Sequence, residues 1–380
     1  MRQQRGFSLI EILVGIVIGM VGLLVIFKTV AIWDNHTRST VSGGDSQVAG
    51  TLAMFNLERD IKSAGLGFSV APATVMGCTV TGVDTRTSRN LSFPLRPVSI
   101  AVGAGGAPDT LTVLTGNSSF FVDGALVRGS TSSTKQFRDA TGFRAGDVAV
   151  LAPGAGVNCE LIEITANSSA TRVAVEHQVG DYVPDPVYLA ASATARYNVA
   201  TGTTGTYVPG GTMFNMGAAP QRNIWSVGGG RMLGRTDDLK EVPAFIEVSD
   251  GVINMKAQYG VDSNNDNVIA DSEWVTPTPG YTPPDWTKVR AVRVALLVRS
   301  SQFEKPVLAS SAAIAMPVTP SSKNPAWAGG NFVMTNVDST SSVDSHSDTD
   351  VVPENWRFYR YRVYEKVIPL RNMIWGTTPP

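Results

Sequence analysis

The sequence predicts an α+β protein: one long N-terminal helix that crosses a membrane and continues beyond it, followed by a large β-rich domain. Residues 7–27 form an apolar run of membrane-spanning length. From residue 75 onward, short runs of alternating apolar and polar residues are separated by stretches rich in Gly, Pro, Ser and Thr, which is typical of strands joined by turns. A chain of 380 residues is long enough to bury a large core, in one body or in two lobes.

The apolar run has the length and the flanks of a membrane anchor. A helix rises 1.5 Å per residue, so a run of this length spans roughly 30 Å, the thickness of a bilayer core. Arg2 and Arg5 precede it, which keeps the N-terminus in the cytoplasm and sends the rest of the chain across. A plain signal anchor explains these features but not Glu11, since a carboxylate costs roughly 2.5–3.5 kcal/mol at the centre of a membrane helix.

The six residues from Gly6 to Glu11, GFSLIE, resemble the processing motif of type IV pilins and pseudopilins. The resemblance implies that prepilin peptidase cuts after Gly6, that residues 1–6 are a leader, and that Phe7 becomes an N-methylated N-terminus. It also implies that Glu11 is the acid of the assembly motif. A buried ammonium and a buried carboxylate cost far less when paired than when apart. We therefore expect Glu11 of one subunit to pair with the Phe7 amine of its neighbour.

Beyond the membrane the helix is expected to continue, with residues 7–33 as the transmembrane and assembly segment and residues 34–70 as its periplasmic extension. The stretch Ser42-Gly43-Gly44-Asp45 predicts an interruption, because glycine pairs favour kinks and aspartate caps new helices.

After this point an apolar stripe with 3-4-3 spacing should pack on a sheet. The stripe consists of Met54, Leu57, Ile61 and Ala64. Arg59 and Asp60 are expected to be solvated, and Gly65 with the residues after it should end the helix.

Residues 71–380 form the predicted β-rich domain. The expected strands are 110–114, 147–151, 159–165, 171–176, 188–197, 244–248, 252–259, 289–298 and 359–369. Stretches rich in Gly, Thr and Ser at 199–218, 227–236 and 309–350 are expected to be linkers, the last a mobile polar loop.

Cys78 and Cys159 are the two cysteines of the chain. In a domain beyond the inner membrane such a pair indicates one disulfide, with two free thiols as the alternative. Closing a loop of this size would stabilise the fold by about 4 kcal/mol in the chain-entropy model.

The stretch 262–273 follows the calcium-loop pattern D-x-[DN]-x-[DN]-G-x5-E, except that Asn267 stands in place of glycine. Asparagine is the next best residue for the left-handed conformation needed there. The expected calcium ligands are the side chains of Asp262, Asn264 and Asp266, the carbonyl of Val268, and either Asp271 or Glu273 as the closing acid. The alternative is an ordinary Asn- and Asp-rich turn between two strands.

Further stretches resemble the PilW family of large minor pilins: LERDIKSAGLGFS, NCELIEIT, DWTKVRAVRVALLVRS, YRYRVYEKVIPLRN and the YGVD that opens the acidic loop. The resemblance implies a type IV pilin-like fold and a minor pilin that acts in pilus assembly, at or near the tip. It also implies a single-pass inner-membrane protein with a periplasmic domain, later incorporated among other minor and major pilins.

Two alternatives remain open: a minor pseudopilin of a type II secretion system, and a calcium-dependent tip adhesin. Enzymatic function is not expected, since the three histidines and the glycine-rich turns lack the context of a catalytic site. Nucleic acid is not expected as a partner, because 31 basic residues balance 32 acidic ones without a polybasic patch.

Overall fold

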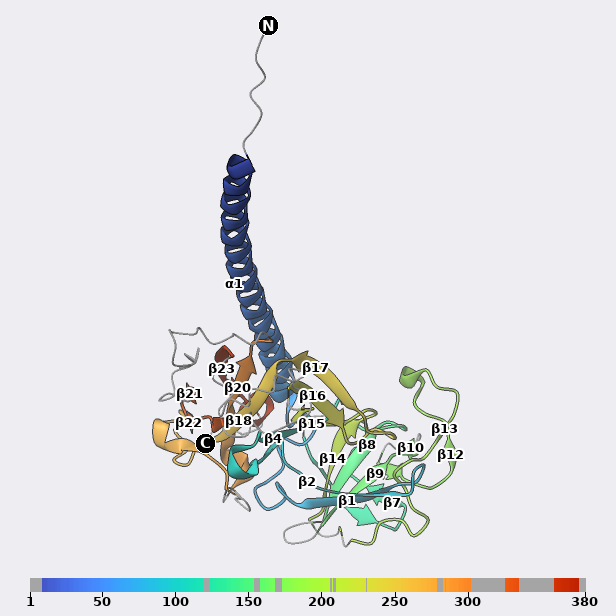
Figure 1. The fold of residues 1–380 in the computed structure, drawn as a ribbon. Helices are drawn as coiled ribbons and strands as arrows, with labels where there is room; N and C mark the ends of the chain where they lie inside the picture. The colour runs from blue at the N-terminus through green and yellow to red at the C-terminus, as the bar shows by residue number, and fades with distance from the viewer. Residues whose placement is uncertain are drawn as a thin grey trace.

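The protein is described here by a computed structural model that covers residues 9–118, 123–153, 158–167, 173–205, 207, 210–229, 231–278, 283, 285–301, 325–334 and 359–375. One long helix, α1 (Leu9–Ser63), projects from a globular part that consists mainly of strands (Figure 1). The predicted α+β architecture is therefore confirmed.

Helix α1 runs without interruption for 55 residues, so the break predicted at Gly43 and Gly44 is wrong. The helix curves gently along its length and shows no sharp bend (Figure 1). Two glycines cost a helix only about 1 kcal/mol each relative to alanine. Tertiary packing of the following turns compensates for this, because Ala53, Leu57 and Ile61 are fully buried against the globular part.

The largest sheet has six strands in the order β2-β1-β9-β8-β14-β5. They are β1 (Thr79–Asp84), β2 (Arg89–Pro94), β5 (Ala125–Leu126), β8 (Val148–Ala152), β9 (Cys159–Glu163) and β14 (Thr212–Gly217). Strands β1 and β9 are parallel, with Val80 opposite Cys159. The expected disulfide between Cys78 and Cys159 is present, and it joins the starts of these two strands.

A second sheet has five strands in the order β17-β16-β15-β4-β3, and a third has four in the order β19-β18-β20-β23. The second consists of β3 (Val98–Ala101), β4 (Thr110–Thr115), β15 (Gln221–Gly228), β16 (Met232–Asp237) and β17 (Phe245–Asp250). The third consists of β18 (Val252–Val261), β19 (Trp274–Val275), β20 (Val289–Arg299) and β23 (Tyr361–Pro369).

The remaining elements are short. One small sheet consists of β6 (Gly129–Ser130), β7 (Thr134–Gln136), β10 (Ala166–Asn167) and β11 (Ala174–Glu176). Two further pairs of strands are β12 (Asp181–Tyr182) with β13 (Ala193–Thr194), and β21 (Ala326–Trp327) with β22 (Gly330–Asn331). The short helices are η1 (Ala104–Gly106), η2 (Pro186–Tyr188), η3 (Asp271–Glu273), η4 (Trp286–Lys288) and α2 (Arg371–Trp375).

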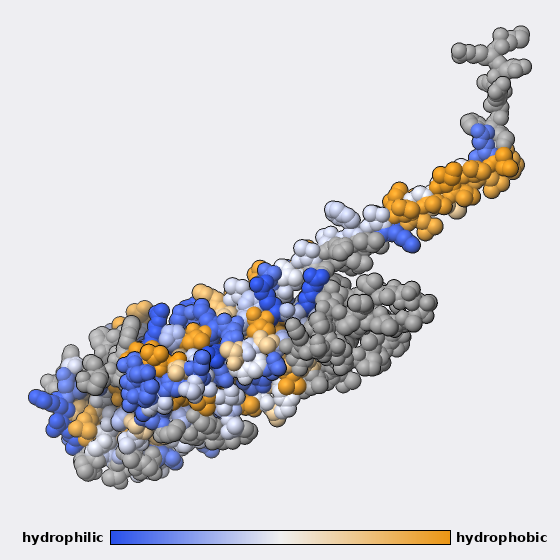
Figure 2. Space-filling model, turned by 90° about the vertical axis from the view of Figure 1, so that its left-hand side faces the viewer, coloured by the Kyte–Doolittle hydropathy of each residue, from blue (hydrophilic) through white to orange (hydrophobic). Residues whose placement is uncertain are grey.

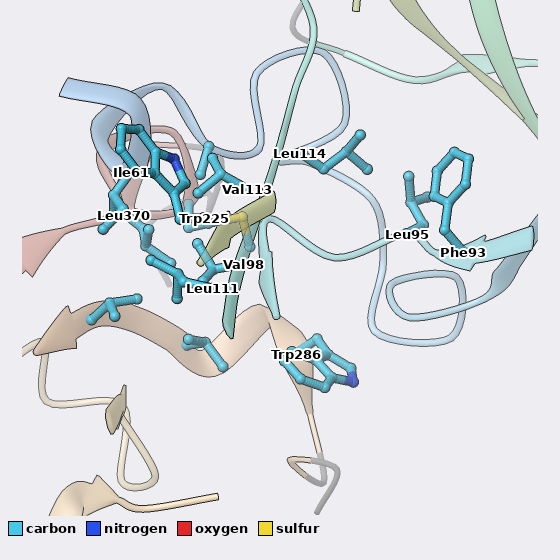
Figure 3. Packing of buried hydrophobic residues seen from close by; sticks show 14 of the residues in the cluster. Ile61, Phe93, Leu95, Val98, Leu111, Val113, Leu114, Trp225, Trp286 and Leu370 are labelled. Atoms are coloured by element: carbon cyan, nitrogen blue, oxygen red, sulfur yellow. The ribbon is translucent and has the colours of Figure 1, made fainter. Parts of the chain in front are cut away.

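The main core lies where the predicted stripe of α1 meets the sheets. Met54, Leu57, Ile61 and Ala64 are all buried, as the 3-4-3 spacing predicts. Figure 3 shows Ile61 beside Trp225 and Leu370, which come from β15 and from the end of β23. The helix is thereby fixed to two sheets at once.

Most expected strands are confirmed within a few residues, but the stretch 188–197 is wrong. It begins at the end of η2, and Leu189 then adopts a left-handed backbone with φ of 55°, which breaks an extended chain. Only β13 follows in this stretch.

Two glycine-rich stretches expected to be linkers instead contain β14, the end of β15 and most of β16. At Gly234 in β16 the reason is packing: a Cβ there would lie 2.3 Å from the Phe245 ring. The glycine lets an aromatic side chain of β17 lie on the strand, which composition alone cannot distinguish from a turn.

The described part of the expected mobile loop 309–350 is also ordered. Strands β21 and β22 form a hairpin, and Phe332 and Met334 are buried against Ala295 and Leu297 of β20. The other residues of that loop lie outside the described ranges.

Candidate functional site

The N-terminal part of α1 is apolar on all sides. Leu9–Val30 is long and apolar enough to cross a membrane, and its side chains are exposed in the monomer. Figure 2 shows this segment as a continuous apolar band that becomes polar toward the globular part. Glu11 lies exposed in the first turn of α1, while Gly6 and Phe7 lie outside the described residues.

Beyond the membrane segment α1 has two apolar faces. The inner face packs on the sheets, as described above. The outer face carries four exposed apolar side chains separated by 7, 4 and 3 residues, which places them on one side of the helix, opposite Leu57 and Ile61. These residues, which we call the outer stripe, are Val41, Val48, Leu52 and Phe55, with exposed fractions of 56, 70, 48 and 60%.

Asp60 lies on the inner face, so the expectation that it is solvated is wrong. It is only 8% exposed and accepts hydrogen bonds from Trp225 Nε1 at 2.5 Å and Asn223 Nδ2 at 3.0 Å. Burial raises the pKa of this carboxyl above its ordinary value, although the two hydrogen bonds oppose the shift. The sequence spacing could have predicted that Asp60 is buried, because it follows Leu57 by three residues and precedes Ala64 by four, which places it on the same side of the helix.

The C-terminal segment of the chain closes the end of α1. Lys366 of β23 lies 2.6 Å from Glu58, which also binds Lys62, and these two ammonium groups lower the pKa of the Glu58 carboxyl. Asn372 donates through Nδ2 to the carbonyls of Ser63 and Ala64 at 3.1 and 3.0 Å. The Ser63 carbonyl also accepts from the N–H of Leu66 at 3.3 Å and from the hydroxyl of Thr115 at 2.8 Å, so Asn372 completes the cap at the end of the helix.

The first half of the 262–273 loop is folded as a calcium-loop pattern predicts. Asp262 is fully buried, and its carboxylate accepts from the backbone N–H groups of Asp266 and Asn267 at 3.1 and 3.2 Å. Asn264 accepts from the N–H of Asp266 at 3.0 Å, and Asp266 from that of Val268 at 2.8 Å. Asn267 has a φ of 62°, the left-handed conformation expected at the glycine position.

The second half of the loop places its acids elsewhere. Glu273 accepts from the N–H of Ser263 at 2.9 Å and from that of Ala270 at 3.0 Å, and bonds from Ser263 and Ala270 lower the pKa of its carboxyl. Asp271 is exposed at the start of η3. Within the ranges that the structure covers, no three His, Cys, Asp or Glu side chains are gathered as a metal would need. The first half of the loop is therefore a tight turn held by side-chain oxygens, and the acid at its far end is engaged with the backbone.

Two comparisons bear on identity. Residues 1–27 match the prokaryotic N-terminal methylation motif, and residues 231–372 match the family described as type IV pilus-assembly protein W, PilW. The second match runs from β16 to the start of α2 and includes the 262–273 loop and the four-stranded sheet. No significant match was found among curated proteins or solved structures. Over these two stretches, and in its apolar N-terminal helix and β-rich domain, the chain is similar to pilin-like proteins of the type IV pilus.

Proposed function

We propose that the protein is a minor pilin, processed by prepilin peptidase and then incorporated into a type IV pilus with other minor and major pilins. The observation that carries this proposal is the outer stripe of α1. It begins beyond the polar stretch 34–40 and runs along α1 for about four turns toward the globular part. A helix that left the membrane only to hold a domain would have a polar outer face. An apolar outer face suits packing against neighbouring helices inside a filament.

Before assembly, the protein would lie in the inner membrane through α1, with its C-terminal domain in the periplasm. The two N-terminal arginines support this orientation, and the Cys78–Cys159 disulfide supports an oxidising compartment. We place it at or near the pilus tip and infer a role in initiating assembly. Its support is size: the β-rich part extends to both sides of the α1 axis and is far wider than the helix (Figure 1), and such a body is accommodated most easily at a filament end.

The test is to shear pili from cells, purify them apart from secreted material, and identify the N-terminal peptide of this chain by mass spectrometry. We expect the chain in the pilus fraction, in low amount relative to the major pilin, beginning at N-methylated Phe7. A chain that keeps residues 1–6 in peptidase-competent cells would contradict the processing. Enrichment with the secretion system, and absence from pili, would favour the pseudopilin alternative.

We further propose that the 262–273 loop binds calcium and that calcium stabilises the β-rich domain. Support comes from the buried Asp262 and the left-handed Asn267, which together bring the side-chain oxygens of the first half into one tight turn. Binding would require Glu273 to exchange its bonds to Ser263 and Ala270 for the ion. That exchange and the modest ligand charge suit an affinity of roughly 10⁻⁶ to 10⁻³ M.

Calcium is therefore expected to raise the melting temperature of the full chain in detergent, and chelator to reverse the change. At a calcium concentration of 100 times Kd, mass action adds about 2.7 kcal/mol to the free energy of unfolding. The double variant Asp262→Ala with Asp266→Ala should lose the response. Glu247→Ala, which removes an exposed carboxylate of β17, should keep it. An unchanged wild-type melting temperature at millimolar calcium would leave the loop as an ordinary turn.

A further inference from the structure

A cavity of about 420 Å³ lies on one face of the sheet edge formed by β2, β1 and β9. Its volume is in the range of small-molecule sites. The segment 197–204 forms the opposite wall. This edge of the sheet is at the end of the globular part away from the N-terminus of α1 (Figure 1).

The floor of the cavity is a row of polar side chains. Ser92 of β2 lies opposite Thr81 of β1, and Thr81 lies opposite Glu160 of β9. Side chains that are opposite one another in neighbouring strands share one face of the sheet. The same face carries Asn90, which is opposite Val83. All five residues line the cavity, so the strand register itself places hydroxyl, carboxylate and amide groups side by side.

The opposite wall is rich in hydroxyl groups and has one aromatic residue. Thr201, Thr203 and Thr204 follow one another closely along it. Tyr197 also lines the cavity, and its hydroxyl is engaged outside, donating to the Leu239 carbonyl at 3.2 Å. Its ring is buried in the main core, with the Arg196 guanidinium 4.9 Å from the ring centroid, so Tyr197 fixes this end of the wall.

Glu160, the charged side chain in the floor of the cavity, already accepts hydrogen bonds. Glu160 accepts from the N–H and the hydroxyl of Thr204 at 3.0 and 2.9 Å, and from the hydroxyl of Tyr207. These bonds fix the carboxylate and tie the wall to β9, while its remaining lone pairs can still accept.

A buried lysine, Lys135, contacts the wall of the cavity from the protein interior. Lys135 is fully buried and donates to Thr203 Oγ1 at 2.9 Å. Its Nζ lies 3.1 Å from Nε2 of His177, which also lines the cavity. Burial, with the lysine beside it, lowers the pKa of His177 to about 4, so this imidazole is neutral at physiological pH. The surface of the cavity is therefore mostly apolar, with neutral donors and acceptors and one fixed carboxylate set into it.

We propose that this cavity binds a neutral saccharide. Sugar rings combine apolar C–H faces with a rim of hydroxyls that both donate and accept. The cavity matches the rim with Ser92, Thr81 and the wall threonines, and the C–H faces with Val83 and Val199. An anionic ligand would be repelled by Glu160, and a wholly apolar one would leave these polar groups unpaired. The proposal concerns a different part of the molecule from α1 and does not depend on the assembly role.

The test is isothermal titration and saturation-transfer NMR on the full chain, in a detergent without a sugar headgroup. The probes are glucose, galactose, mannose, N-acetylglucosamine, maltose and lactose, with glucuronate as the anionic control. At a typical binding free energy per non-hydrogen atom, mono- and disaccharides bind with a Kd in the millimolar to high micromolar range. We expect saturable binding of at least one neutral sugar and at least tenfold weaker binding of glucuronate.

Two matched variants locate the site. Ser92→Trp should fill the cavity and weaken binding about tenfold or more, the loss expected when roughly one good contact is removed. Thr79→Trp places the same bulk on the same face of β1 at an exposed residue that does not line the cavity, and should change Kd less than twofold. Both variants should keep the wild-type melting temperature. Absence of saturable binding to every neutral sugar would overturn the proposal, as would equal binding by wild type and Ser92→Trp.

Discussion

A Glu11→Ala protein is expected to insert into the membrane normally and to be almost absent from pili. Glu11 lies exposed in the first turn of α1, at the start of Leu9–Val30. Removing its carboxylate makes insertion easier, because the charge is the costly part of this segment. In the filament, however, the neighbour's N-terminal ammonium would lose its partner. An unpaired buried charge costs roughly 3–5 kcal/mol, which lowers the equilibrium incorporation by about two to three and a half orders of magnitude.

The measurement compares the chain in membrane and pilus fractions by quantitative immunoblotting. Ile18→Ala is the matched control, since it trims an exposed side chain of the same segment without changing charge. Glu11→Asp keeps the carboxylate and should recover part of the incorporation. If Glu11→Ala entered pili at the wild-type level, charge pairing between subunits would not be needed for assembly.

Asp60→Leu is expected to lower the free energy of unfolding by roughly 2–6 kcal/mol. The substitution removes the acceptor for Trp225 Nε1 and Asn223 Nδ2, both in the main core. Each buried donor left without a partner costs about 1–3 kcal/mol. Arg59→Leu is the control, because the exposed neighbouring side chain should matter by less than about 0.5 kcal/mol. Denaturant unfolding of the full chain in detergent would measure both.

Asp60 should also make the free energy of unfolding depend on pH. Burial raises the pKa of Asp60 above the ordinary value of 3.8, despite the opposing attraction of Arg235. The contribution of protonated Asp60 to the free energy of unfolding is therefore fully present at pH values below the pKa of this group in the unfolded chain. It is lost as pH rises through the higher folded-state pKa. Nearby Asp237 adds to the shift. Asp60→Asn, which stays neutral, should flatten this part of the pH profile, and an unchanged profile would mean that Asp60 does not titrate in the folded protein.

Local signals in the sequence were sufficient for the extent of α1 and for most of the strands that were expected, but β1, β2, β3 and most of β15 were not expected. The apolar spacing predicted the inner face of α1, and period-two alternation predicted β18 and β20. Sheet order could not be predicted in this way, because β1 pairs with β9 across about 80 intervening residues and nothing local specifies that choice. Gly234 was misleading for a similar reason: the ring that needs the space belongs to another strand.

At the candidate sites, too, the sequence predicted local backbone features but not the contacts that depend on the tertiary fold. In the 262–273 loop the residue types predicted the left-handed Asn267, which depends on the local backbone. They did not predict that Glu273 would bind Ser263 and Ala270, because η3 determines where that carboxylate lies. The saccharide cavity was not foreseen at all, since Ser92, Thr81 and Glu160 become neighbours only through strand pairing.

The hydrogen bonds from Asn372 to the end of α1 have a consequence for biogenesis. The helix leaves the ribosome first, and Leu66 and Thr115 can satisfy the Ser63 carbonyl early. The Ala64 carbonyl, just beyond the helix, receives the Asn372 amide only when residue 372 has been synthesised. Tyr364 of β23 must also arrive before its ring can pack on Gly50, where a Cβ would lie 2.2 Å from it. During translation and export the inner face of α1 therefore stays without its final cover. If the protein is incorporated into a pilus as proposed, α1 becomes fully covered only after residue 372 has crossed the membrane, which would couple entry into the filament to the folding of β23 and α2.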